Sequence, residues 1–309
     1  MIEPSIERRR FLGALAATTA ATTTSVLGGC QNAQGAPPPT AQPEPVAVAP
    51  PDIWAKVREQ FELSPEWLHF AGFLLASHPK PVREAIERHR RALDENPALY
   101  LEAHSRDNAS VLEPAAAYLG AAPNEVALTD STTMGLATLY AGMPLAQGDE
   151  VLTTTHDHYS THESLRLACE RAGATLRRVP LYDRSVSATP AAMVRALQVA
   201  LSSKTKLVAI TWVHSSTGVK TPVKAIAEMV AHANRARSPE RRTLLAVDGV
   251  HGFGVENVTM AELGCDFFVA GTHKWLFGPR GTGLIWGKAA DWALLRPTIP
   301  HFGAAGYGA

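Results

Sequence analysis

Short apolar runs alternate with stretches of helical periodicity along the chain after residue 52. Seven runs have the length and composition of strands, and they cover residues 126–129, 150–154, 175–179, 207–213, 243–247, 267–270 and 283–286. Most of the segments between them have helical patterns, and apolar spacing predicts further helices over 81–95 and 109–119. Short buried strands separated by helices are typical of α/β folds. The pattern therefore predicts a mostly parallel sheet of about seven strands with helices on both faces.

Residues that begin or end helices in proteins stand at the boundaries of these segments. They are Thr189 with Pro190, Thr221 with Pro222, Thr259 with Glu262, Gly120 and Gly173. Threonine followed by proline predicts an N-cap and a first helical residue, and Thr259 with Glu262 predicts a capping box. The two glycines predict helix ends.

The first fifty residues have the composition of an export signal and a tether. Arginines at positions 8–10 precede an uncharged stretch over 13–27, and the pair at 8–9 resembles the twin-arginine signal. Cys30 follows two glycines in a candidate lipoprotein box. Residues 1–30 are therefore predicted to be an export signal and 31–51 a Pro/Ala-rich tether. We expect a periplasmic or cell-surface protein that contacts the membrane only through a lipid on Cys30.

Folding is expected to start near residue 52. An N-terminal helical segment over 52–125 would precede the α/β domain over 126–309. The 29 basic and 29 acidic residues give no net charge, which excludes a nucleic-acid partner because such proteins carry an excess of Lys and Arg. Three cysteines (Cys30, Cys169 and Cys265) are too few and too scattered for a disulfide framework or a thiolate metal site.

Polar residues concentrate where the predicted strands end. These places are residues 129–135, 154–162, 213–218, 247–252 and 271–274. Ligands of open α/β sheets bind beyond the carboxyl ends of the strands. We therefore expect the functional site to be built from these five segments.

The strand over 267–270 leads into Gly271, Thr272, His273 and Lys274, and a glycine-rich stretch over 278–283 follows. A lysine at the mouth of a sheet becomes nucleophilic when burial lowers its pKa. This stretch resembles the lysine signature of the class V aminotransferase family of pyridoxal-phosphate enzymes, which have fold type I. The resemblance implies that Lys274 forms the Schiff base (aldimine) with pyridoxal 5'-phosphate. It also implies that Thr272 and His273 help to bind the phosphate.

Asp248 ends an apolar strand, where a carboxylate needs a cation or a donor as its partner. In the resembled family this aspartate pairs with the protonated pyridine nitrogen and makes the ring an electron sink. The alternative for Asp248 is an N-cap of the next helix. His251 matches a residue close to the cofactor ring and its phenolic oxygen.

Thr132 and Thr133 follow a strand and open a helix, where backbone N–H groups bind phosphate. They are also ordinary capping residues, and the family uses the equivalent loop for the cofactor phosphate. The pair Asp157-His158 matches an acid–histidine pair, which implies that His158 lies flat on the cofactor ring. Family members often have Asn where this chain has Ser215, so either Ser215 or the preceding His214 would contact the phenolic oxygen.

The isopenicillin N epimerase-like branch is the part of the family that the chain resembles most. The resemblance implies an amino-acid-like substrate, removal of its α-proton by Lys274, and a homodimer. A cysteine desulfurase, a selenocysteine lyase or an aminotransferase would share the same cofactor. A desulfurase needs a mobile, reactive cysteine. Cys169 lies within a predicted helix and Cys265 next to a predicted strand, so neither is expected to be mobile.

Two functions of a different class stay open beside these enzymes. One is a zinc hydrolase that uses His156, His158 and His162, with Asp157 as a fourth ligand. The second is a non-catalytic exported binding protein that has kept the fold.

Only a short tail follows residue 286. Family members carry a smaller C-terminal domain after the cofactor-binding domain, usually with an arginine for the substrate carboxylate. We therefore expect the large domain of fold type I over 126–309, with the small domain absent or truncated.

Overall fold

The computed structural model describes residues 51–104 and 107–299. The predicted export signal, Cys30 and nearly all of the predicted tether lie outside these ranges. The chain divides into two compact units, residues 1–61 and 62–309. Helix α2 (Pro51–Glu59) is the element of the first unit that the structure describes. Within the described ranges, no helix is both long and apolar enough to cross a bilayer.

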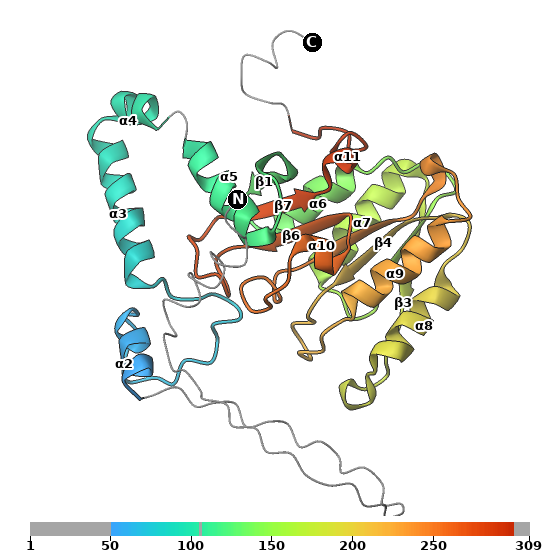
Figure 1. Cartoon of the computed structure of the whole chain (residues 1–309), viewed down its shortest axis with the longest axis horizontal. Coiled ribbons are helices and arrows are strands. Elements are labelled where there is room, and N and C mark those ends of the chain that lie inside the picture. The colour runs from blue at the N-terminus through green and yellow to red at the C-terminus, as the bar shows by residue number, and fades with distance from the viewer. Residues whose placement is uncertain (1–50, 105–106, 300–309) are drawn as a thin grey trace, which may run out of the picture. The chain divides into compact units, whose positions relative to one another are not determined.

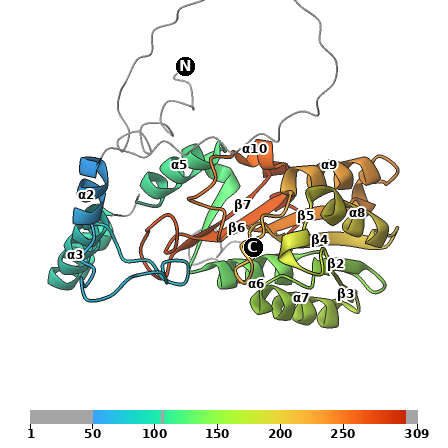
Figure 2. The ribbon, with the colours of Figure 1, turned by 90° about the horizontal axis from the view of Figure 1, so that it is seen from below.

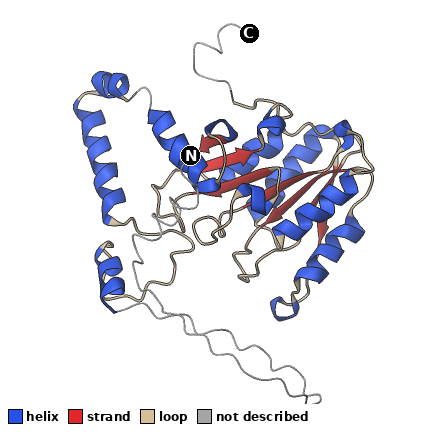
Figure 3. Ribbon diagram, in the orientation of Figure 1, coloured by secondary structure: helices blue, strands red, loops and turns tan. Residues whose placement is uncertain are grey.

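The second unit is built on a seven-stranded sheet (Figures 1 and 3). Its strands are β1 (Val126–Thr129), β2 (Glu150–Thr154), β3 (Thr175–Val179), β4 (Thr205–Thr211), β5 (Leu244–Asp248), β6 (Phe267–Gly271) and β7 (Gly283–Gly287). They lie in the order β1-β7-β6-β5-β4-β2-β3. Strand β7 runs antiparallel to both of its neighbours, β1 and β6, and the pairs from β6 to β3 are parallel. The predicted mostly parallel sheet is therefore confirmed, and each predicted strand lies within two residues of its observed position.

Helices cover both faces of this sheet, as predicted. The helices of the second unit are α3 (Lys80–Glu95), α4 (Pro97–Ala103), α5 (Asp107–Leu119), α6 (Thr132–Gly142), α7 (Tyr159–Ala172), α8 (Pro190–Ala200), α9 (Val223–Asn234), α10 (Met260–Leu263) and α11 (Ala289–Trp292). Figure 2 shows α6 and α7 on one face and α5, α8, α9 and α10 on the other. Alternate strand residues face opposite sides, so Leu245 and Val247 enter one core and Leu244 and Ala246 the other. All four are buried, which explains why β5 is apolar until Asp248.

Most predicted helix boundaries are confirmed by their hydrogen bonds. The Thr189 hydroxyl accepts the Ala192 N–H at 3.3 Å, and Thr259 forms the capping box with Glu262. Gly173 ends α7 with a φ of 67°, a conformation that costs glycine little. The prediction for Thr221 is wrong: Pro222 is the N-cap of α9, which begins at Val223, and the buried Thr221 hydroxyl caps no backbone N–H.

Two glycines hold the loop after β5 against the sheet. A Cβ added at Gly249 would lie 2.0 Å from the Phe268 ring, and one at Gly252 would lie 2.1 Å from Trp212. We expect Gly249→Ala to destabilise the fold by about 3 kcal/mol, because overpacking forces neighbouring groups to move. Chemical denaturation measures this loss. Gly72→Ala is the control, since nothing lies within 4 Å of that position, and equal stabilities of the two variants would refute the steric argument.

Candidate functional site

A cavity of about 290 Å³ lies at the carboxyl ends of the strands. Eight of the nine predicted site residues line it: Thr132, Thr133, His158, Ser215, Asp248, His251, His273 and Lys274. They follow β1, β2, β4, β5 and β6, so each of the five predicted segments contributes to one site. The expectation that polar strand ends converge in a parallel sheet is confirmed.

Thr272 is the predicted residue that does not line the cavity. Its hydroxyl is hydrogen-bonded to the hydroxyl of Thr282, and its backbone N–H bonds to the Thr282 carbonyl. Thr272 therefore fixes the turn between β6 and β7 in this structure. Its role as a phosphate ligand stays a prediction.

Lys274 points into the cavity from the turn after β6. Its amine nitrogen lies 3.4 Å from Nε2 of His251. Burial lowers the pKa of Lys274, and the nearby Asp248 opposes this shift. A lowered pKa increases the fraction of the neutral, nucleophilic amine.

Asp248 lines the cavity with only 3% of its surface exposed. One carboxyl oxygen accepts the Val250 N–H at 3.1 Å. Burial raises the pKa of Asp248 to about 7, and this hydrogen bond and Lys274 oppose the shift. A buried carboxylate of this kind is stabilised by a cation placed beside it.

Asp157 is a buried anchor between two strand ends. Its carboxylate accepts the Thr153 hydroxyl at 2.7 Å and the Thr154 N–H at 2.6 Å, both from β2. The other oxygen accepts the Thr211 N–H of β4 at 2.8 Å. Asp157 therefore fixes the position of the turn that carries His158.

His158 caps the N-terminus of α7. Its Nδ1 accepts the Ser160 N–H at 3.3 Å and lies 2.8 Å from the Ser160 hydroxyl. Burial and the charge of Lys274 lower the pKa of His158, which favours the neutral ring. A neutral imidazole suits stacking on a flat aromatic cofactor, and this role stays a prediction.

The three histidines of the zinc hypothesis use their nitrogens elsewhere. Nε2 of His156 accepts the Leu181 N–H at 3.2 Å, and Nε2 of His162 lies 2.8 Å from the Thr154 carbonyl oxygen. In residues 51–104 and 107–299, no three His, Cys, Asp or Glu side chains are placed to bind one metal ion. The arrangement therefore gives the zinc hypothesis no support.

Ser215 and His214, the two candidates for contact with the phenolic oxygen, lie in different environments. Ser215 lines the cavity, whereas His214 is 1% exposed, with its Nδ1 3.0 Å from the Tyr182 hydroxyl. His214 also lies 3.8 Å from the Asp157 carboxylate. Of the two, Ser215 is the residue placed to contact a group in the cavity.

Phe73 and Leu74 are lining residues that the sequence did not suggest. They come from an irregular segment more than fifty residues before β1. The Ala76 N–H bonds to the His273 carbonyl at 3.3 Å and ties this segment to the site. Because the segment has no helical or strand periodicity, only its apolar content could have drawn attention to it.

Pyridoxal 5'-phosphate, the cofactor implied by the resemblance, fits these residues. Asp248 is a buried carboxylate suited to a protonated ring nitrogen, and Lys274 is a buried amine suited to an aldehyde. Thr132 and Thr133 begin α6, whose first backbone N–H groups suit a phosphate. The Thr132 hydroxyl also accepts the Gly271 N–H at 2.7 Å, which joins this helix end to the end of β6.

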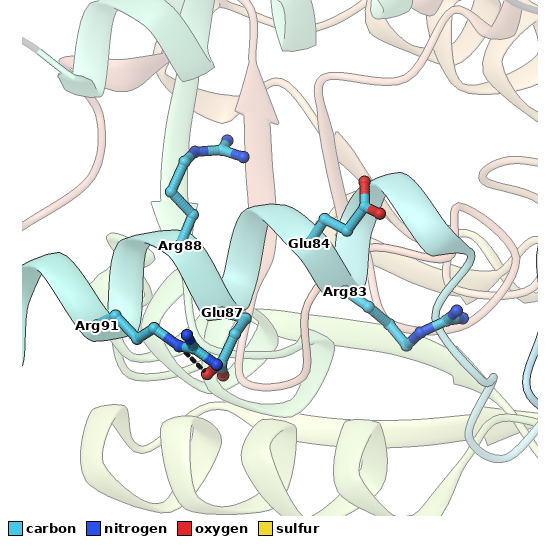
Figure 4. Close-up of a pocket in the computed structure, with 5 residues that line it drawn as sticks. All are labelled: Arg83, Glu84, Glu87, Arg88 and Arg91. Atoms are coloured by element: carbon cyan, nitrogen blue, oxygen red, sulfur yellow. Dashed lines mark hydrogen bonds and ion pairs between the residues drawn. The ribbon is translucent and has the colours of Figure 1, made fainter.

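A second hollow lies on α3 (Figure 4). It is lined by Arg83, Glu84, Glu87, Arg88 and Arg91 of that helix. Glu87 pairs with Arg91 at 2.5 Å, and its hydrogen bonds to Arg90 and Arg91 lower its pKa to about 2. These are solvated charges on one helix, without a buried nucleophile, so this hollow is not the candidate active site.

Residues 101–301, about two-thirds of the chain, match the family model described as Aminotransferase class-V. A probable cysteine desulfurase of Halalkalibacterium halodurans is 33% identical over 177 residues, which are 56% of this chain and 40% of that protein. Isopenicillin N epimerase of Amycolatopsis lactamdurans is 28% identical over 257 residues, which are 81% of this chain and 61% of that protein. The chain thus spans only about half the length of these curated relatives.

Solved structures share the fold. A mutant of C-DES with glycine covalently linked to its pyridoxal-phosphate cofactor superposes with a TM-score of 0.71 at 24% identity, covering 81% of this chain and 65% of that one. The apo cysteine desulfurase of Thermococcus onnurineus NA1 gives a TM-score of 0.68 at 20% identity, covering 81% and 60%. Together with the family match and the site, this fold places the chain in a known group. The chain belongs to the aminotransferase class V family of pyridoxal-phosphate enzymes.

Proposed function

We propose that this protein removes the α-proton of an amino-acid substrate, with Lys274 as the base. The observation that carries the proposal is the meeting of Lys274 and Asp248 in one cavity. Bound pyridoxal phosphate supplies an aldehyde for the substrate amine and a ring that accepts electron density from the α-carbon. The lowered pKa of Lys274 favours an amine that can take up a proton, and the buried Asp248 carboxylate would pair with the ring nitrogen of the bound cofactor and favour its protonated form.

Epimerisation at the α-carbon is the first candidate for the overall reaction. The alignment with isopenicillin N epimerase covers 81% of the chain and supports it. In this reaction the proton returns to the opposite face of the α-carbon. His158 and Lys274 both line the cavity, and His158 is the second titratable side chain that we propose for this proton transfer.

Cleavage of a carbon–sulfur bond is the second candidate, because relatives include cysteine desulfurases. Neither of the two cysteines that the structure describes is placed to act as a reactive thiol. Cys169 and Cys265 are both buried, and burial raises the pKa of Cys169 to about 11. Burial and Asp266 also raise the pKa of Cys265 well above its ordinary value. A buried, protonated thiol is a poor sulfur acceptor.

Replacing both Cys169 and Cys265 by Ala is expected to change the rate of the reaction by less than about twofold, because neither thiol lines the cavity. Circular dichroism checks that the double variant is folded. A loss of about 100-fold in sulfide release with the fold intact would show that one of these thiols carries sulfur.

Incubation of the cofactor-loaded protein with amino acids in D₂O tests the proposed function. We expect deuterium at the α-carbon by NMR. Inversion of configuration then identifies an epimerase, and release of sulfide from cysteine or cystine identifies a carbon–sulfur lyase. Absence of α-exchange with every amino acid, in protein that has bound the cofactor, would refute the proposal.

We also propose export by the twin-arginine route and assembly as a homodimer. The arginines at positions 8–9 and the uncharged stretch after them support the first point. That route carries folded proteins, so the cofactor could be bound before export. The family resemblance supports the second point, and a lipid on Cys30 would provide the membrane contact.

A further inference from the structure

Trp275, the residue after Lys274, contacts the site through His251. Its indole Nε1–H donates a hydrogen bond to Nδ1 of His251 over 3.1 Å. The centroids of the two rings lie 6.4 Å apart and the ring planes meet at 71°, which is an edge-to-face arrangement. Trp275 points its only polar side-chain atom at the imidazole, and an indole nitrogen can donate but cannot accept.

This hydrogen bond determines which nitrogen of His251 carries the proton. Nδ1 must accept, so a neutral His251 has its proton on Nε2. His251 is 8% exposed, and burial is the largest cause that lowers its pKa to about 4. The ring is therefore neutral at ordinary pH, with Nε2–H as its donor.

Nε2 of His251 lies 3.4 Å from the amine nitrogen of Lys274. If Nε2 is the donor, the lysine nitrogen must be the acceptor, and only an unprotonated amine has a free lone pair. The titratable groups around Lys274 besides His251 are Asp248, which raises the pKa of the amine, and His158, which is held neutral. The direction of the His251 contact thus favours the uncharged amine.

We propose that Trp275 is a positioning residue that fixes His251 as the Nε2–H tautomer and thereby keeps the Lys274 amine in its acceptor, unprotonated form. The backbone holds the two partners in register. Gly254, with a φ of 88°, brings the loop that carries His251 so close that an added Cβ would lie 2.8 Å from the Trp275 carbonyl carbon. The imidazole and the indole therefore have little freedom to separate.

Nitrogen-15 NMR of the histidine rings in the full-length chain, before and after loading with pyridoxal phosphate, tests the tautomer directly. In the wild type we expect His251 to show an unprotonated Nδ1 and a protonated Nε2. Assignment by comparison with His251→Gln identifies the signals. A protonated Nδ1 in the wild type would overturn the proposal without any further variant.

Trp275→Phe keeps an aromatic ring and removes the donor. We expect a mixture of His251 tautomers and a roughly fivefold lower rate of acylation of Lys274 at neutral pH in cofactor-free protein, which corresponds to the loss of one hydrogen bond of about 1 kcal/mol. Trp292→Phe is the matched control, because its indole donates to the Glu125 carbonyl at 3.3 Å away from the cavity. Unchanged tautomers in folded Trp275→Phe would refute the role.

A double-mutant cycle separates positioning from mere packing. If Trp275 acts through His251, the Trp275→Phe change has no further effect on Lys274 acylation in the His251→Gln background. An equal effect, about fivefold in both backgrounds, would show that Trp275 acts by another path. The inference concerns the site of the proposed function, but the tautomer is measured without substrate. The tautomer proposal can therefore be refuted while α-proton exchange is observed. Equally, the tautomer can be found as expected in a protein that shows no α-proton exchange.

Discussion

Replacing Lys274 by Ala is expected to reduce α-proton exchange by about 10³-fold or more. A positioned general base contributes roughly 10²–10⁴-fold, and loss of the covalent attachment of the cofactor adds to this. In the described part of the chain, Lys274 is the lysine that lines the cavity. Exchange is measured by NMR in D₂O at saturating pyridoxal phosphate.

Lys80→Ala is the matched control for this prediction. Lys80 lies at the start of α3, is exposed, and forms a 3.9 Å ion pair with Glu84. Surface pairs of this kind contribute little to stability, so this variant should keep the wild-type exchange rate. Exchange in folded Lys274→Ala within about tenfold of the wild type would show that another group is the base.

Asp248→Asn is expected to stabilise the cofactor-free protein at pH 8 while it impairs cofactor binding. The pKa of Asp248 is about 7 in the folded chain and near 3.8 in the unfolded one. Between these values the folded chain binds more protons, so the stability of the cofactor-free protein falls as the pH rises from about 4 to above 7. The full shift corresponds to roughly 4 kcal/mol, which the variant avoids because Asn is uncharged.

Denaturant unfolding at pH 5 and pH 8, with and without pyridoxal phosphate, checks this prediction. Without cofactor, the variant should exceed the wild type in stability by about 2 kcal/mol at pH 5 and by roughly 4 kcal/mol at pH 8. With cofactor, the wild type should gain more stability, since its carboxylate pairs with the protonated ring nitrogen. If the wild type were more stable than the variant at pH 8 without cofactor, the claim that the ionised Asp248 carboxylate is destabilised by burial would be wrong.

Most of the sheet could be predicted from sequence because β2, β4, β5, β6 and β7 are buried on both faces. β5 and β6 are apolar at nearly every position, so each stands out as a short run. Polar residues such as Asp248 and Lys274 then mark the strand ends, and the geometry of a parallel sheet brings these ends together. The site followed from this arrangement and from the resemblance to a known lysine motif.

Features that depend on tertiary contacts could not be predicted in this way. Thr221 has the sequence of an N-cap, but its buried hydroxyl caps no backbone N–H, and α9 begins at Val223, one residue later than predicted. Phe73 belongs to a segment without a pattern of its own, which a backbone hydrogen bond from Ala76 to His273 joins to the site. The bond from Trp275 to His251 joins two loops, so neither loop alone indicates it.

The most direct test of the account is to locate the cofactor on the chain. Purified protein is loaded with pyridoxal phosphate, reduced with borohydride, digested and analysed by mass spectrometry. We predict one modified lysine, Lys274, together with loss of the visible absorbance band on reduction and no modified peptide from Lys274→Ala. Absence of bound cofactor, or its attachment to a lysine outside the cavity, would contradict the assignment of this site.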